Sequence, residues 1–354
     1  MTAFLCQTRK SNQIRFEGEN GLTNISRAQQ QVQAAMTAVE TAAATQAEKA
    51  EMLIEIAMGL QQKPERAEDI FAAVDLYKLA MDLAPEGEVL GVARIRARMA
   101  TALMAVPAED ATQLKEAKIE IETALATLTA EGSDAEVAEA EMNLGLICQT
   151  LAGMRLLPIQ PAISAYQRSL RTFDKTNYPK EFAILQSNLA TAFLSMPFTD
   201  QSGKMREALA VQAFEEALTV VNLIDHPNEY AMLQNNLGNA LQYVSSSHRV
   251  ENGFRALEAY DEALKVRTIR DMPEEYANTI ANKANCLSNL PDDPQNPDGG
   301  NYGNLTEAVR LLEEARGVFA KRGAGEKAQA VTEAITELNA ALGPSTILER
   351  SGLQ

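Results

Sequence analysis

A helix-like pattern occurs six times in this sequence, and its regular return is the strongest constraint on the fold. Each copy has Ala, an apolar residue four positions later and Ala seven positions later, which places all three on one face of a helix. The six sets are Ala73/Tyr77/Ala80, Ala117/Ile121/Ala124, Ala162/Tyr166/Ser169, Ala210/Phe214/Ala217, Ala256/Tyr260/Ala263 and Ala308/Leu312/Ala315. Only Ser169 departs from the Ala signature. The pattern therefore predicts six equivalent helices.

A second pattern precedes each of these helices: an apolar residue, a small residue and, three positions further on, a large one. The sets are Ile56-Ala57…Leu60, Met99-Ala100…Leu103, Leu144-Gly145…Cys148, Leu189-Ala190…Phe193, Leu237-Gly238…Leu241 and Lys283-Ala284…Leu287. Lys283 stands where an apolar residue is expected, and Cys148 is smaller than its counterparts. The two patterns together predict six helical hairpins.

The spacing of these anchors shows how the hairpins are joined. From the first Ala of a second helix to the small residue of the next first helix, the steps are 27, 28, 28, 28 and 28 residues. Inside a hairpin, from the small residue to that Ala, they are 16, 17, 17, 20, 18 and 24. Stacking requires a constant register between hairpins, whereas a turn at the edge of the array can lengthen. The spacing therefore predicts stacked hairpins.

Three hairpins share a start motif, in which Pro179, Pro227 and Pro273 each precede Glu, an aromatic residue and Ala. Proline fits a helix start because its missing N–H has no intrahelical partner there, and Glu in the first turn complements the helix dipole. These motifs predict that the later first helices begin at the prolines.

The flanking segments differ in composition from the repeats. We expect a polar, flexible tail at 1–26, an N-terminal capping helix at 27–44, the repeat array at 45–320, and a C-terminal capping helix with a frayed end at 321–354. Gly343-Pro344 ends that last helix in the prediction.

The amino-acid composition disfavours several classes of binding partner. The formal net charge of −16 argues against nucleic acid and against an anionic membrane surface, since both attract basic proteins. The 46% hydrophobic but only 5% aromatic content suits close-packed helices. No stretch is apolar for long enough to span a membrane, and the N-terminus lacks the features of a signal peptide.

Three scattered cysteines, Cys6, Cys148 and Cys286, are too few for a disulfide framework or a zinc site. Cys148 and Cys286 fall on predicted core faces, where cysteine behaves as a small apolar residue. We therefore expect a protein of the reducing cytoplasm.

The Asn-Leu-Gly…Leu pattern of the first helices and the Ala…Tyr…Ala pattern of the second resemble the tetratricopeptide repeat (TPR) over residues 45–320. The period, 45 to 48 residues between successive asparagines at 143, 188, 236 and 282, is longer than the usual TPR. It is similar to the long repeats of kinesin light chain and of bacterial arrays found beside CHAT proteases. No protease domain follows the array here, so that activity is not expected.

The resemblance implies an all-α, right-handed solenoid of about six TPR-like hairpins with terminal capping helices. In such a superhelix the residue before the apolar-small pair faces the concave groove. That series is Glu55, Arg98, Asn143, Asn188, Asn236 and Asn282, with Asn239 and Asn285 one turn further on. An amide offers both a donor and an acceptor to the backbone of an extended peptide. The alternative is that these amides bond to neighbouring helices, and Arg98 is expected either to grip a carboxylate or to be solvated.

Three other features are interpreted as structural. The aromatic residues of the second helices occupy the packing position of the repeat. The loop 291–304 clusters Asp292, Asp293 and Asp298, but it lacks the spacing of a calcium loop and is expected to be a surface turn. The two histidines, His226 and His248, lie in predicted turns without a nucleophile motif.

We therefore expect a non-catalytic scaffold, adaptor or assembly factor of the bacterial cytoplasm, without cofactor or metal, that binds an extended segment or a helix of a client protein. A regulatory module acting with a separately encoded protease or signalling enzyme, and a self-associating scaffold, stay open. The sequence does not decide the oligomeric state.

Overall fold

The computed structural model describes residues 26–106, 110–196, 202–244 and 248–343. The described residues form helices and loops and contain no strand. The α-helices are α1 (Arg27–Thr41), α2 (Gln46–Gln62), α3 (Ala67–Leu83), α4 (Val89–Ala105), α5 (Thr112–Glu131), α6 (Asp134–Gly153), α7 (Gln160–Ser169), α8 (Pro179–Leu194), α9 (Ser202–Leu218), α10 (Pro227–Tyr243), α11 (Arg249–Leu264), α12 (Pro273–Leu287), α13 (Tyr302–Lys321) and α14 (Gly325–Leu342). A short 3-10 helix, η1 (Pro297–Gly299), lies in the loop before α13.

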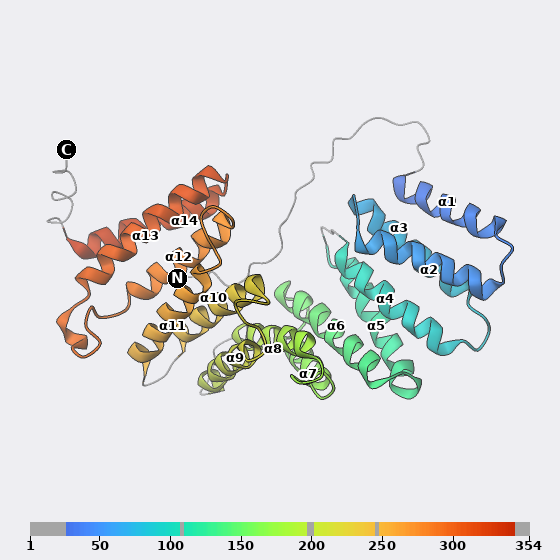
Figure 1. Cartoon of the computed structure of the whole chain (residues 1–354), viewed down its shortest axis with the longest axis horizontal. Helices are drawn as coiled ribbons and strands as arrows, with labels where there is room; N and C mark the ends of the chain where they lie inside the picture. The colour runs from blue at the N-terminus through green and yellow to red at the C-terminus, as the bar shows by residue number, and fades with distance from the viewer. Residues whose placement is uncertain (1–25, 107–109, 197–201, 245–247, 344–354) are drawn as a thin grey trace. The chain divides into compact units, whose positions relative to one another are not determined.

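The chain divides into two compact units, Met1–Pro85 and Glu86–Gln354. In the first, α2 and α3 form a hairpin against which α1 packs. In the second, the pairs α4/α5, α6/α7, α8/α9, α10/α11 and α12/α13 form five hairpins in sequence order, and α14 packs on α13 (Figure 1). The predicted all-α array of paired helices is confirmed.

Each predicted second helix carries its Ala…apolar…Ala face into the core. The tyrosines Tyr166 and Tyr260 are fully buried, and so is Phe214 at the equivalent position. A Cβ atom on Gly145 would lie 2.4 Å from the Tyr166 ring, and one on Gly238 would lie 2.6 Å from the Tyr260 ring. Glycine is therefore the residue that lets these rings lie directly on the first helix, which confirms the aromatic series as core.

The two polar departures from the repeat patterns each have a polar partner. Ser169 is completely buried and donates to the carbonyl of Ala138 on the other helix of its hairpin, at 2.7 Å. Lys283 forms an ion pair with Asp261 on α11. A buried hydroxyl is tolerated when it is hydrogen-bonded, and the Lys283 ammonium is compensated by a carboxylate.

Three of the four 28-residue connections between hairpins contain the same turn. Asp174, Asn222 and Thr268 lie at equivalent positions, twelve residues after the first Ala of their helices. Each side chain accepts a backbone N–H from two or three residues further on. The residue before the proline then donates its N–H to the carbonyl of the same residue: Tyr178 to Asp174 (3.0 Å), His226 to Asn222 (3.1 Å) and Met272 to Thr268 (2.9 Å). Helices α8, α10 and α12 begin at the prolines, as predicted.

Other helix starts are satisfied by side chains. Ser26, Thr45 and Ser133 each accept the N–H of the residue three positions on, and the side chain of that residue accepts the N–H of the capping residue. These reciprocal bonds satisfy donors that a helix start leaves unpaired. The predicted 1–26 tail lies outside the described residues except for Ser26, as does the chain after Gly343.

Candidate functional site

The predicted groove series is carried by the first helices of successive hairpins. Asn143 lies on α6, Asn188 on α8, Asn236 on α10 and Asn282 on α12, and each of these side chains is half-buried. Arg98, on α4, is exposed. Helix α6 packs against α4 and α8, and α12 packs against α10, so the helices that carry Arg98, Asn143 and Asn188 are in contact in turn, as are those that carry Asn236 and Asn282.

Two of the asparagines have uncommitted amides. The side chains of Asn143 and Asn188 make no hydrogen bond to any residue that the structure describes. A half-buried amide with free donors and acceptors gains more from a ligand than a solvated one, because part of its hydration is already lost. These two residues have the properties that the binding interpretation requires.

The members on α10 and α12 bond to one another across two hairpins. Asn282 donates to Oδ1 of Asn235 at 3.3 Å, and Asn235 donates to Oδ1 of Asn236 at 3.4 Å. Asn235 is buried, and nothing in the sequence pattern had singled it out. The three amides therefore form a chain of hydrogen bonds between the two first helices.

The asparagines one turn further on also bond to neighbouring side chains. Asn239 accepts from the hydroxyl of Tyr260 at 2.8 Å, within its own hairpin. Asn285 is exposed and donates to the hydroxyl of Tyr243 at 3.0 Å, which links α12 to α10. The asparagines on α10 and α12 thus bond to neighbouring side chains, as the structural interpretation of the series requires. Asn143 on α6 and Asn188 on α8 have no such bond among the described residues.

Arg98 differs from the other arginines on α4. Arg94 pairs with Glu136 of α6 at 2.6 Å, and Arg96 pairs with Glu120 of α5. The side chain of Arg98 has no ion pair or hydrogen bond among the described residues. It is therefore the guanidinium on α4 that a ligand carboxylate could reach without displacing a partner.

The Arg94–Glu136 pair strongly perturbs one carboxyl group. Hydrogen bonds from Arg94, and then from the N–H and hydroxyl of Ser133, lower the pKa of Glu136 to about 2. The pair links α4 to α6 beside the predicted groove series. It joins the two helices that carry Arg98 and Asn143.

A second hydrogen-bond series was missed at the level of sequence. Three tyrosine hydroxyls of the second helices lie within hydrogen-bond distance of a glutamine four residues after the small residue of the first helix, and Tyr260 shares its hydrogen between this glutamine and Asn239. The pairs are Tyr77 and Gln61 (2.9 Å), Tyr166 and Gln149 (2.6 Å), and Tyr260 and Gln242 (3.2 Å). Where the aromatic residue is Phe214, the matching position holds Leu194 instead of glutamine. In the sequence, glutamine thus accompanies tyrosine and leucine accompanies phenylalanine, and this correlation could have predicted the hydrogen bond.

The remaining candidates have structural contacts. In the loop 291–304, both oxygens of Asp292 accept backbone N–H groups, from Gly303 at 2.8 Å and Asn304 at 2.7 Å. Burial raises the pKa of Cys286 to about 12, and its thiol donates to the carbonyl of Gly253. Within the described ranges, no group of three or more His, Cys, Asp or Glu side chains is arranged to hold a metal ion.

Both histidines lie at helix starts. His226 is the residue before α10, and His248 precedes α11, where it lies 3.4 Å from Glu251.

No described helix is long and apolar enough for a membrane span.

Comparison with known proteins adds little detail. No family model matches this chain, and no curated protein matches it. Among solved structures, it is similar to the TPR2AB domain in the pHSP90 complex of yeast Sti1, with 15% sequence identity and a TM-score of 0.28. That match covers 82% of this chain and 99% of the other.

Proposed function

We propose that this protein is a non-catalytic interaction scaffold, an adaptor or assembly factor that binds an extended segment or a helix of a client protein on its first helices. The observation that carries the proposal is the pair of half-buried, uncommitted amides of Asn143 and Asn188 on adjacent helices. The resemblance of the repeat motifs to the tetratricopeptide repeat supports it.

The chemistry of an amide suits a partner's backbone. Each asparagine can accept an N–H and donate to a carbonyl, which an extended segment presents at every residue. A hydrogen bond of this kind contributes about 0.5–1.5 kcal/mol, so two amides alone give weak binding. Arg98, on α4, the first helix of the preceding hairpin, adds a charge-assisted contact to a carboxylate of the client.

The residues of the predicted groove series have two different roles in this function. Asn143, Asn188 and Arg98 contact the client directly. The amides on α10 and α12 hold those helices together and keep the surface in one shape, so that less conformational entropy is lost on binding. Asn282 and Asn285 use donor groups for this purpose, and their acceptor oxygens are available to the client.

The test is affinity capture from a native extract, with proteins quantified by mass spectrometry. The double variant N143A/N188A is expected to lose the captured client. The matched control is N228A, which removes an exposed asparagine from the first turn of α10. Equal capture by all three folded proteins, with folding verified by circular dichroism, would contradict the proposed site.

A further inference from the structure

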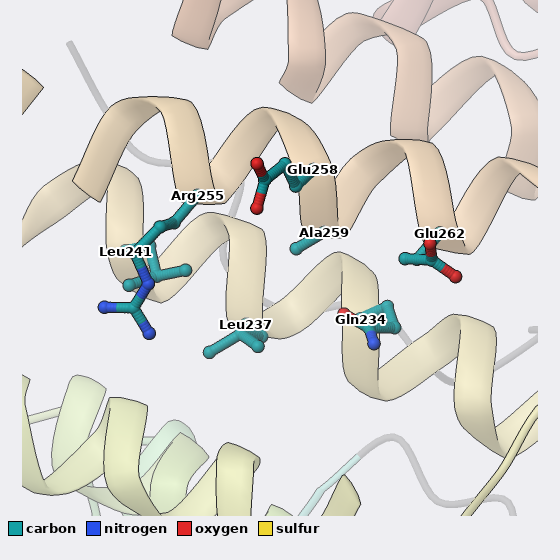
Figure 2. A pocket seen from close by; sticks show the side chains of 7 residues that line it. All are labelled: Gln234, Leu237, Leu241, Arg255, Glu258, Ala259 and Glu262. Carbon is teal, nitrogen blue, oxygen red and sulfur yellow. The ribbon is translucent and has the colours of Figure 1, made fainter. Parts of the chain in front are cut away.

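An open hollow of about 330 Å³ lies between α10 and α11 (Figure 2). Gln234, Leu237 and Leu241 line it from α10. Helical steps of three and four place them on one face, about half a turn away from Asn236 and Asn239. The hollow is therefore distinct from the predicted groove series.

The lining is apolar at the bottom and acidic at the edge. Leu237, Leu241 and Ala259 are buried core residues. Glu258 and Glu262 project from α11 on either side of Ala259 (Figure 2). Such a lining suits a side chain with an aliphatic stem and a cationic end.

The charges around the hollow are unevenly compensated. Arg255 also lines it, but its guanidinium is paired with Glu215 of α9. Glu262 pairs with Lys265 at 2.5 Å and accepts from Tyr230 at 2.9 Å. Glu258 is exposed and has no hydrogen-bond or ion-pair partner among the described residues. Its carboxylate lies four residues from that of Glu262, a spacing at which like charges repel on a helix.

The next hairpin shows what the hollow lacks. Counting from the first Ala of each second helix, Arg310 of α13 takes the place of Glu258, and Leu311 takes the place of Ala259. Arg310 pairs with both Glu307, at 2.7 Å, and Glu314, at 3.2 Å. There the chain supplies its own cation and a larger apolar side chain, whereas α11 supplies an uncompensated carboxylate and an alanine.

We propose that the α10/α11 hollow binds an arginine or lysine side chain from a protein partner. The aliphatic stem lies over Leu237, Leu241 and Ala259, and the cation lies between the carboxylates of Glu258 and Glu262. The occupant thus supplies the charge that Arg310 supplies in the next hairpin, and its attraction to a chain of net charge −16 favours the encounter.

The test is methyl NMR on the full chain, with the peptide N-acetyl-Leu-Arg-Leu-amide as the probe. The same peptide with citrulline in place of arginine is the neutral isostere. We expect saturable shifts of the Leu237 and Leu241 methyl groups, with the arginine peptide binding roughly tenfold more tightly than the citrulline peptide. E258Q, at an exposed position, is expected to remove that preference.

Two further variants separate this site from the proposed groove. A259L introduces the residue that α13 has at this position and is expected to block the shifts, while N228A, at an exposed position in the first turn of α10, is expected to leave them unchanged. The proposal is overturned if neither peptide shifts the two methyl groups, if both bind equally, or if E258Q retains the preference. Shifts confined to residues beside Asn143 and Asn188 would also overturn it while supporting the groove.

Discussion

At the level of single residues, a comparison of the repeats shows which side chains are hydrogen-bond partners. A buried tyrosine hydroxyl must have a partner, and in three hairpins a glutamine of the first helix serves as one, which in the Tyr260 hairpin shares the hydrogen with Asn239. Phe214 has no hydroxyl, and leucine occupies the partner position, 194. The same logic explains Ser169, whose hydroxyl finds a backbone carbonyl.

The first prediction concerns the Tyr166–Gln149 bond. Y166F removes a hydroxyl whose 2.6 Å bond is inside the hairpin, and it should lower the free energy of unfolding by about 1 kcal/mol. Adding Q149L reproduces the Phe214/Leu194 combination and should recover part of the loss. Urea unfolding of the two single variants and the double variant measures the coupling, and strictly additive effects would show that the bond is unimportant.

The second prediction concerns the glycines beneath the aromatic rings. G238A places a methyl group 2.6 Å from the Tyr260 ring and should destabilise the protein by about 1–3 kcal/mol. The control is G317A in α13, where an added Cβ would have no side chain or backbone atom within 4 Å other than those of its own stretch of helix. That change should stabilise by about 0.5–1 kcal/mol, because alanine favours helix. Chemical denaturation that gives both variants the same sign would contradict the packing described here.

At the level of elements, the helices and their order could be predicted from the sequence. Ala and aromatic residues at helical spacing, with proline at three helix starts, define the elements locally. The hydrogen bonds of Asn235 and Tyr243 could not be predicted in this way, because they join different hairpins and depend on side-chain rotamers. The division of the chain into two compact units at Pro85 and Glu86 was also not predicted. The step from Ala73 to Ala100, which spans this division, is 27 residues, whereas the other four steps are 28.

The turn that three of the 28-residue connections share gives the third prediction. Asn222 accepts two backbone N–H groups, both at 2.9 Å, and its replacement by alanine leaves them without this acceptor. N222A should lower the free energy of unfolding by about 0.5–1.5 kcal/mol. N228A, a nearby exposed position, should change it much less. Thermal unfolding of both proteins checks this, and equal melting temperatures would count against the turn.

The α4–α6 ion pair gives a prediction about pH. Because the pKa of Glu136 in the folded protein, about 2, lies below its ordinary value of 4.5, the ionised carboxylate stabilises the fold. That contribution is present above pH 4.5 and is lost as the pH falls toward about 2. E136Q should therefore be less stable than the natural protein near neutral pH, and the difference should shrink in acid. The control E139Q, an exposed glutamate on the same helix, should show no such trend; an E136Q difference that persists in acid would contradict the assignment.

At the level of the whole molecule, the chain forms two compact units of helices and carries a strongly negative net charge. The net charge of −16 predicts weak binding to phosphate-rich surfaces, and this stays a prediction. The sequence could not indicate which amides are free, because Asn143 and Asn282 look equivalent in the repeat. Only the folded arrangement distinguishes uncommitted amides from amides that hold two helices together.

The most direct measurement is site-specific photo-crosslinking in cells, with a photoreactive amino acid at position 143 or 188 of the full chain. The control position is Gln167, which is exposed on α7, the other helix of the Asn143 hairpin. The account predicts a covalent adduct with a protein client from both positions and none from position 167. Adducts from 167 but not from 143 or 188 would place the client on the second helices and contradict the central claim.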